Sequence, residues 1–185
     1  MEIVEKVLTD AIVLRPRVLN DNRGYFYESF NDKVFESLSG NKVNFIQDNQ
    51  SHSSKGTLRG LHFQTGSAAQ AKLVRVTKGS AYDVAVDLRP DSPTFKKWHG
   101  VELSEDNHLQ FFIPRGFAHA FVALEDNTIF QYKVDNYYSS VNDGGVIWND
   151  EELAITWPEL NLELSPKDLK LPNIKAINLS KLWTD

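Results

Sequence analysis

The chain has no cysteine among its 185 residues, so it can form neither a disulfide nor a thiolate metal site. This absence agrees with a reducing cytoplasm, the compartment we expect for the protein. No apolar stretch approaches the roughly 20 residues of a membrane-spanning helix, and the first residues lack the pattern of a signal peptide. The net charge of −5 gives no support for binding a nucleic-acid backbone. We therefore expect one domain over residues 1–185, with neither a membrane nor a nucleic-acid partner.

The sequence also lacks an internal repeat and any Gly-, Ser- or Pro-rich linker. Short runs of alternating polarity dominate it, and they lie at residues 72–77, 81–88, 119–124 and 128–134. Turn-forming residues separate these runs, and many short strands at such spacing predict an all-β sandwich or barrel. Helical patterns are confined to residues 31–38, which Gly40 follows as a stop signal, and to a helix start at Ser165-Pro166. The expected fold is an all-β barrel with a few short peripheral helices.

One half of a metal-site signature is present and the other half is missing. Pro114-Arg115-Gly116-Phe117-Ala118-His119 matches Pro-x-Gly-x-x-His, which resembles the second motif of the small β-barrels called cupins. A metal-binding cupin would show His-x-His and then a glutamate in its first motif. Here that position reads His62-Phe63-Gln64, and the next charged residue is Lys72. Because a single histidine cannot hold a metal, the pattern favours proton chemistry over metal chemistry.

His62 and Lys72 are candidates for that chemistry. A histidine in an apolar strand is more often a hydrogen-bonded core residue than a catalyst, but Arg59 and Lys72 lie close to His62 in the sequence. If Val74 and Val76 point into the barrel, Lys72 does so too, and a buried ammonium needs an anionic ligand or partner. In the opposite register Lys72 faces water, and the strand pattern alone does not decide between the two.

Four further polar residues have simple structural explanations. Tyr132 alternates with large apolar residues, as a core tyrosine would. Asp168 completes a capping box that begins at Ser165. His119 fits a polar contact inside the barrel. Arg23 stands beside three aromatic residues, where it could hold a phosphate while a ring stacks on a base, but composition alone favours an ordinary turn followed by an edge strand.

Several segments nevertheless occur together in the order and spacing of one known family. They are Gly24-Tyr25-Phe26-Tyr27-Glu28-Ser29-Phe30, Gln47-Asp48-Asn49-Gln50-Ser51, Leu58-Arg59-Gly60-Leu61-His62-Phe63-Gln64, Lys72-Leu73-Val74-Arg75-Val76, Ile113-Pro114-Arg115-Gly116-Phe117-Ala118-His119, Tyr132-Lys133, Tyr137-Tyr138 and Trp148-Asn149-Asp150. From about Arg23 to Asp168 the chain closely resembles the dTDP-4-dehydrorhamnose 3,5-epimerases. The resemblance implies a metal-free, cupin-like jelly roll that forms a homodimer and needs no cofactor.

The activity that the resemblance implies is the inversion of C3 and C5 of dTDP-4-dehydro-6-deoxy-D-glucose through an enolate. The product is dTDP-4-dehydro-L-rhamnose, an intermediate of dTDP-L-rhamnose biosynthesis that leads to cell-envelope polysaccharide.

The resemblance also implies a role for each matched residue. His62 is similar to the family's proton acceptor and Asp168 to its carboxylate partner, while Tyr132 matches the proton donor on the opposite face. Lys72 matches the residue at the C4 oxygen. The implied substrate-binding residues are Arg23, Phe26, Glu28, Gln47, Asp48, Asn49, Arg59, His119, Tyr138, Asp143 and Lys167. Asp143 stands where the family often has glutamate, which keeps the charge but shortens the reach.

Three other functions stay open at the level of the sequence. A mono-epimerase acting at C3 or C5 alone would use the same residue types. A metal-dependent cupin oxygenase is disfavoured because the His-x-His motif is absent. A non-catalytic nucleotide-sugar binding module would not need His62, Lys72 and Tyr132 together.

Overall fold

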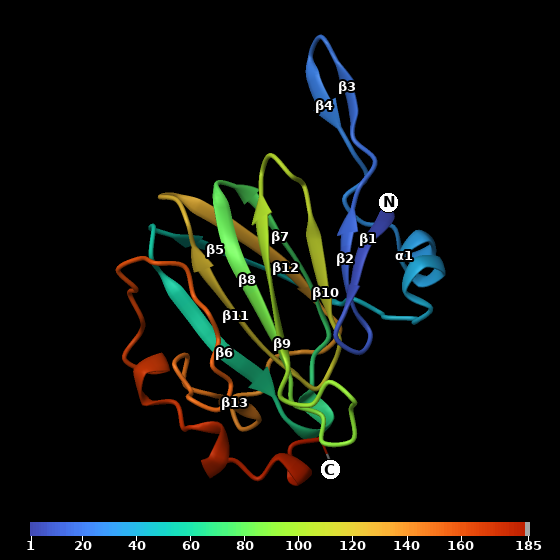
Figure 1. Cartoon of the computed structure of the whole chain (residues 1–185). Coiled ribbons are helices and arrows are strands. Elements are labelled where there is room, and N and C mark those ends of the chain that lie inside the picture. Colours follow the sequence, from blue (N-terminus) through green and yellow to red (C-terminus); the bar gives the residue numbers. More distant parts are fainter. Residues whose placement is uncertain (184–185) are drawn as a thin grey trace.

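Figure 1 presents the computed structural model of the chain, which describes residues 1–183. Two antiparallel sheets face each other, and this confirms the predicted all-β, cupin-like jelly roll. The six-stranded sheet has the order β1 (Glu2–Val7), β2 (Ala11–Arg15), β10 (Gln110–Ile113), β7 (Lys72–Lys78), β12 (Thr128–Val134) and β5 (Gln47–Ser53). The five-stranded sheet has the order β13 (Asp143–Gly145), β6 (Leu58–Gln64), β11 (Phe117–Ala123), β8 (Ser80–Asp87) and β9 (Trp98–Ser104).

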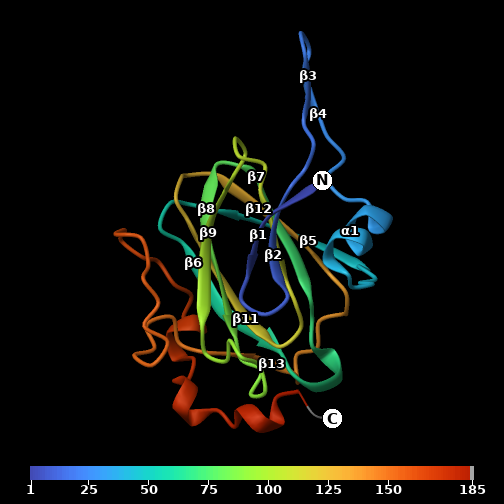
Figure 2. The same cartoon turned by 45° about the vertical axis from the view of Figure 1, so that its right-hand side comes forward.

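A separate two-stranded hairpin stands away from both sheets. It consists of β3 (Leu19–Asp21) and β4 (Gly24–Phe26), and both views show it projecting from the body of the molecule near the N-terminus (Figures 1 and 2). All six residues of its strands are exposed. Leu19 is 51% exposed and Phe26 is 69% exposed, so packing within the chain leaves much of these two apolar side chains uncovered.

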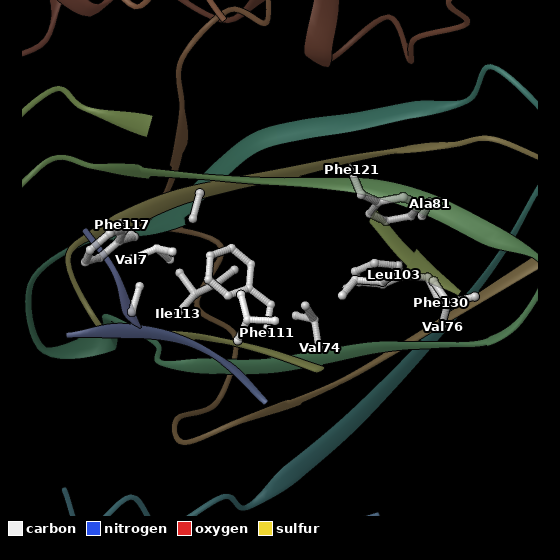
Figure 3. Close-up of a cluster of buried hydrophobic side chains, with 13 residues drawn as sticks. Val7, Val74, Val76, Ala81, Leu103, Phe111, Ile113, Phe117, Phe121 and Phe130 are labelled. Atoms are coloured by element: carbon white, nitrogen blue, oxygen red, sulfur yellow. The ribbon is translucent and has the colours of Figure 1, made fainter. Parts of the chain in front are cut away.

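The hydrophobic core fills the space between the two large sheets (Figure 3). Val74 and Val76 of β7 point into it, so the strand adopts the register in which Lys72 also faces the barrel interior. Phe121 of β11 and Phe130 of β12 stack across the two sheets with ring centroids 4.0 Å apart. This aromatic pair joins the sheets where the core gives way to a polar cavity.

Helix α1 (Asp32–Ser39) covers the outer face of the six-stranded sheet, as the sequence pattern predicts. The Asn31 side chain accepts the backbone N–H of Val34, and Gly40 ends the helix in the left-handed conformation with φ 71°. Phe35 is fully buried between the helix and the sheet. The helix therefore completes the core on the side away from the polar cavity.

The chain after β13 wraps across the outer face of the five-stranded sheet (Figure 1). It contains three short 3₁₀ helices, η2 (Asp168–Lys170), η3 (Ile174–Ala176) and η4 (Leu179–Lys181), and a fourth, η1 (Gly66–Ala68), lies between β6 and β7. The capping pattern at Ser165 is present, since the Ser165 hydroxyl accepts the backbone N–H of Asp168, but it begins a single 3₁₀ turn. In residues 1–183 no helix is long and apolar enough to cross a membrane.

Candidate active site

A cavity of about 580 Å³ opens between the two sheets beside the chain that carries η2. The four residues predicted to do the chemistry all line it, and they come from four separate elements. The predicted site residues among its lining are His62, Lys72, Tyr132, Asp168, Arg59, His119, Tyr138, Asp143 and Lys167. Residues separated by more than a hundred positions in the sequence thus share one polar space.

His62 and Asp168 form a close pair at one wall of the cavity. His62 Nε2 lies 2.6 Å from Asp168 Oδ1, and the aspartate side chain is almost fully buried. Burial lowers the pKa of His62, although the hydrogen bond and charge of Asp168 oppose this shift. The imidazole is therefore neutral near pH 7. With Nε2–H donated to the carboxylate, Nδ1 is the nitrogen that can accept a proton.

Lys72 lies at the start of β7 and faces the same cavity. Burial lowers the pKa of its ammonium to about 8, while the nearby charges of Asp83 and Asp143 oppose the shift. At neutral pH the side chain is still mostly charged. A cation with few water molecules around it interacts strongly with any negative charge that develops nearby.

Tyr132 reaches the cavity from the opposite sheet to His62. Burial raises the pKa of its phenol, and the charge of Arg59 partly opposes this. The hydroxyl is therefore protonated at neutral pH and can donate a hydrogen. Because β12 and β6 belong to different sheets, Tyr132 and His62 stand on two facing walls.

A second histidine–carboxylate pair, His119 with Asp83, lies beside the first. His119 is the direct cross-strand neighbour of His62, and its Nε2 lies 2.8 Å from Asp83 Oδ2. Asp83 is fully buried, and its second oxygen has no hydrogen-bond partner among residues 1–183. Sequence reasoning did not include Asp83 in the site. The available signal was a charged residue on the inward face of β8, next in alternation to the buried Ala85.

Asp143 and Lys167 form an ion pair at the rim of the cavity. The other oxygen of Asp143 accepts a hydrogen bond of 3.1 Å from the Gln64 side chain. The pKa of Lys167 is raised, chiefly by its hydrogen bond with Asp143. The carboxylate of Asp143 is therefore already paired with two side chains of its own chain. Through Lys167 it also connects β13 to the residue next to Asp168.

The remaining predicted substrate contacts lie outside this cavity in the single chain. Gln47, Asp48 and Asn49 lie on the edge strand β5, where Asp48 pairs with Lys133 and with Asn49 lines a smaller hollow of about 190 Å³. Three more lie on or next to the projecting hairpin, namely Arg23, Phe26 and Glu28. Arg23 there pairs with its neighbour Asp21.

Metal binding finds little support in the described part of the chain. Across residues 1–183 no three His, Asp or Glu side chains converge in a way that could hold a metal ion. The two cavity histidines each direct one ring nitrogen to a carboxylate, at His62–Asp168 and His119–Asp83.

Comparison with known proteins gives consistent matches over nearly the whole chain. The family model described as dTDP-4-dehydrorhamnose 3,5-epimerase matches residues 5–176. The curated protein of that name from Escherichia coli K12 is 55% identical over 183 residues, which covers 98% of this chain and 99% of the relative.

Solved structures agree with this match. A crystal structure of dTDP-4-dehydrorhamnose 3,5-epimerase from Bacillus anthracis, with TDP and PPi bound, is 54% identical with a TM-score of 0.91 and covers 94% of this chain and 99% of its own. The epimerase from Legionella pneumophila, in complex with dTDP-4-keto-L-rhamnose, is 42% identical with a TM-score of 0.94 over 100% of this chain and 98% of its own.

Proposed function

The chain belongs to the dTDP-4-dehydrorhamnose 3,5-epimerase family, and we propose that it inverts C3 and C5 of dTDP-4-dehydro-6-deoxy-D-glucose with the residues of the 580 Å³ cavity. One observation supports this proposal most directly: three kinds of group line the same cavity. They are the neutral His62–Asp168 pair, the weakly hydrated ammonium of Lys72 and the protonated hydroxyl of Tyr132. Each supplies one part of the chemistry that epimerisation next to a ketone requires.

Proton removal falls to His62. The C4 ketone acidifies the hydrogens on C3 and C5, because loss of either proton gives an enolate. A neutral imidazole held by Asp168 can take that proton, and the carboxylate stabilises the imidazolium that forms. Neither a redox cofactor nor a metal is needed in this scheme.

Lys72 stabilises the enolate. Its ammonium lies in the cavity where the C4 oxygen would gain negative charge, and burial keeps water from screening it. A single donor at a developing oxyanion is worth about 3–4 kcal/mol in well-studied enzymes. The His119–Asp83 pair, directly beside His62, is placed to hold the same oxygen or a neighbouring hydroxyl.

Inversion requires a proton from the other side of the sugar ring. Tyr132 is suited to this because it stands on the wall opposite His62 and burial keeps its hydroxyl protonated. A sugar held between the two walls loses a proton to His62 on one face and receives one from Tyr132 on the other.

Two copies of the chain complete the nucleotide site in this proposal. Arg23, Phe26 and Glu28 match substrate-contact positions of the family, yet they lie on or beside a hairpin that does not line its own cavity. Phe26 is 69% exposed, as expected for a side chain that a partner covers. A homodimer in which each hairpin reaches the other copy's cavity accounts for both facts. We place this homodimer in the cytoplasm, where it supplies precursors of cell-envelope polysaccharide.

Proton NMR of the 4-keto sugar nucleotide in heavy water tests the proposed function. The expected result is deuterium at both C3 and C5, with the couplings of the doubly inverted product. Exchange and inversion at one carbon alone would identify a mono-epimerase, and binding without exchange at either carbon would identify a non-catalytic binding module.

A further inference from the structure

Residues 108–110 of the barrel contact the hairpin β3–β4 and the chain that follows it. The ring of His108 packs against two tyrosines, with centroid distances of 4.9 Å to Tyr25 and 5.1 Å to Tyr27. Two residues further on, the buried side chain of Gln110 donates a hydrogen bond of 2.8 Å to the backbone carbonyl of Ser29. The strand of the hairpin that returns to the barrel is therefore held at two points.

The loop that carries His108 is itself well ordered by hydrogen bonds. The side-chain oxygen of Asn107 accepts the backbone N–H groups of Ser104 and Leu109, and its amide donates to the carbonyl of Glu102. His108 adopts the left-handed conformation with φ 53°, which directs its ring out of the loop. The ring is thus a fixed support rather than a side chain on a loose turn.

Alternation after Gly24 separates this support from two of the predicted substrate contacts, Phe26 and Glu28. Tyr25 and Tyr27 share one side of the extended chain, and their rings stack with centroids 5.8 Å apart. Phe26 and Glu28 occupy the other side, since successive residues of an extended chain point in opposite directions. The side that docks on the barrel is therefore opposite to the side that could enter a neighbouring cavity.

We propose that His108 is a positioning residue for the epimerase reaction, one that fixes the angle of the hairpin so that Arg23 and Phe26 enter the cavity of a second copy of the chain. This inference rests on the proposed function and its homodimer. His108 itself touches no substrate in this arrangement. Its influence passes through Tyr25 and Tyr27, and it acts on the active site of the other copy.

Kinetics of His108 variants test the positioning role. In His108→Ala we expect KM for the sugar nucleotide to rise about tenfold and kcat to change less than threefold, because the barrel of each copy still holds a complete set of chemical groups. His108→Phe keeps a ring at the same place and should restore KM to within twofold of the wild type. Titration calorimetry with dTDP gives a readout without turnover, and its Kd should rise with KM in His108→Ala.

A second variant keeps the test decisive if His108→Ala folds poorly. Tyr25→Ala removes the other side of the stack and leaves the loop unchanged, so it should raise KM in the same way, whereas Tyr25→Phe should not. The double variant His108→Ala/Tyr25→Ala should have a KM no higher than that of the poorer single variant, because both single variants remove the same contact between His108 and Tyr25. Additive losses would contradict a shared role.

Mixed dimers test whether the effect reaches the other copy. His62→Ala lacks the proposed base but has an intact hairpin support, and His108→Ala has the reverse. Co-expression with two affinity tags yields a dimer in which the intact cavity receives the intact hairpin. We expect this dimer to recover wild-type KM at about half the wild-type kcat.

The outcomes separate this inference from the proposed function. If His108→Ala binds dTDP and turns over substrate like the wild type, the positioning role is wrong while the epimerase proposal stands. If His108→Ala is impaired and the mixed dimer does not recover, the hairpin serves its own chain and action on the second copy is wrong. If the wild type shows no epimerisation but dTDP affinity still falls in His108→Ala, the proposed reaction is wrong. The inference that His108 positions the hairpin for nucleotide binding then still stands.

Discussion

Burial within one cavity sets the protonation state of each group that the proposed reaction uses. It lowers the pKa of His62 and of Lys72 and raises the pKa of Tyr132. All three shifts favour the form with less charge, as expected when groups leave water. At neutral pH the result is an uncharged base, a protonated tyrosine and an ammonium that still holds its proton.

Removal of the base is the simplest test at this scale. We expect His62→Ala to lose proton exchange at both C3 and C5, because the imidazole that would accept the proton is gone and the family resemblance assigns no second residue to that role. Deuterium uptake followed by NMR measures this directly. Rapid exchange at either carbon in a folded His62→Ala protein would assign the base elsewhere.

The activity should depend on pH in a bell shape. Lys72 loses its proton as pH rises through about 8, so kcat/KM should fall above that value. The pKa of His62 lies below its ordinary value of 6.5, so activity should be lost only when the pH falls below this range and the imidazole takes up a proton. Steady-state kinetics measured from about pH 5 to 10, in steps of about one pH unit, defines the acidic and the alkaline limb of this profile.

A matched variant identifies the alkaline limb. Lys72→Arg keeps a positive charge at all accessible pH values, so any activity that remains should no longer fall near pH 8. An alkaline limb that stays unchanged in Lys72→Arg would assign it to another group.

Tyr132→Phe should separate proton removal from inversion. The variant loses the hydroxyl, but His62 and Lys72 can still form and stabilise the enolate. Deuterium should then enter the substrate while the doubly inverted product falls sharply. A core tyrosine with no catalytic role would instead lose about 1 kcal/mol of stability and keep normal turnover.

Among the secondary-structure elements, the wrapped C-terminal segment has the most direct effect on the site. It carries Asp168 to β6 and covers the outer face of the five-stranded sheet with Leu153 and Ile174. Asp150 holds this segment in place, since its two oxygens accept the backbone N–H groups of Glu152, Leu153 and Ile174.

Asp150→Ala should therefore affect stability and catalysis together. The variant leaves buried N–H groups without an acceptor, and we expect the free energy of unfolding to fall by about 3 kcal/mol. Because Asp168 lies between the two ends that Asp150 joins, kcat should fall as well. Glu151→Ala, at the exposed neighbouring position, should change stability by less than about 0.5 kcal/mol. Chemical denaturation and steady-state kinetics measure both effects, and equal stability of the two variants would refute this role of Asp150.

The sequence predicts individual strands and helices better than it predicts which distant segments contact one another in the fold. Alternation around Val74 and Val76 and the signals at Asn31 and Gly40 are local, and the structure confirms the strand and the helix they indicate. The pairing of His62 with Asp168 depends on a long chain path, and no local pattern encodes it; only the family resemblance pointed to it. Asp83 was missed although alternation along β8 indicates its inward face, because that pattern does not say which side chain it meets there.

On the scale of the whole molecule, the absence of a complete cupin metal motif leads to a prediction about metals. We expect full activity after exhaustive treatment with EDTA and no stoichiometric metal by elemental analysis. The physical reason is that no three His, Asp or Glu side chains converge within residues 1–183, so His62 and His119 lack the further ligands that a metal site needs. Activity that disappears with chelator and returns with a divalent ion would overturn the metal-free scheme.

The family resemblance inferred from the motifs is confirmed by the family-model match over residues 5–176. The placement of Arg23 and Phe26 could not be predicted from the same motifs, because a motif does not say which copy of a chain its residues serve. That information lies in the path of the hairpin, which leaves its own barrel (Figure 2).

The order in which the ribosome makes the chain gives the position of Asp168 a further meaning. Every strand of both sheets precedes the segment that carries Asp168, so the strands leave the ribosome before the carboxylate that pairs with His62. During that interval the imidazole has no partner to fix its tautomer or to stabilise its charged form. In the proposed mechanism a nascent chain is thus an incomplete catalyst until the segment that carries Asp168 has folded back onto the barrel.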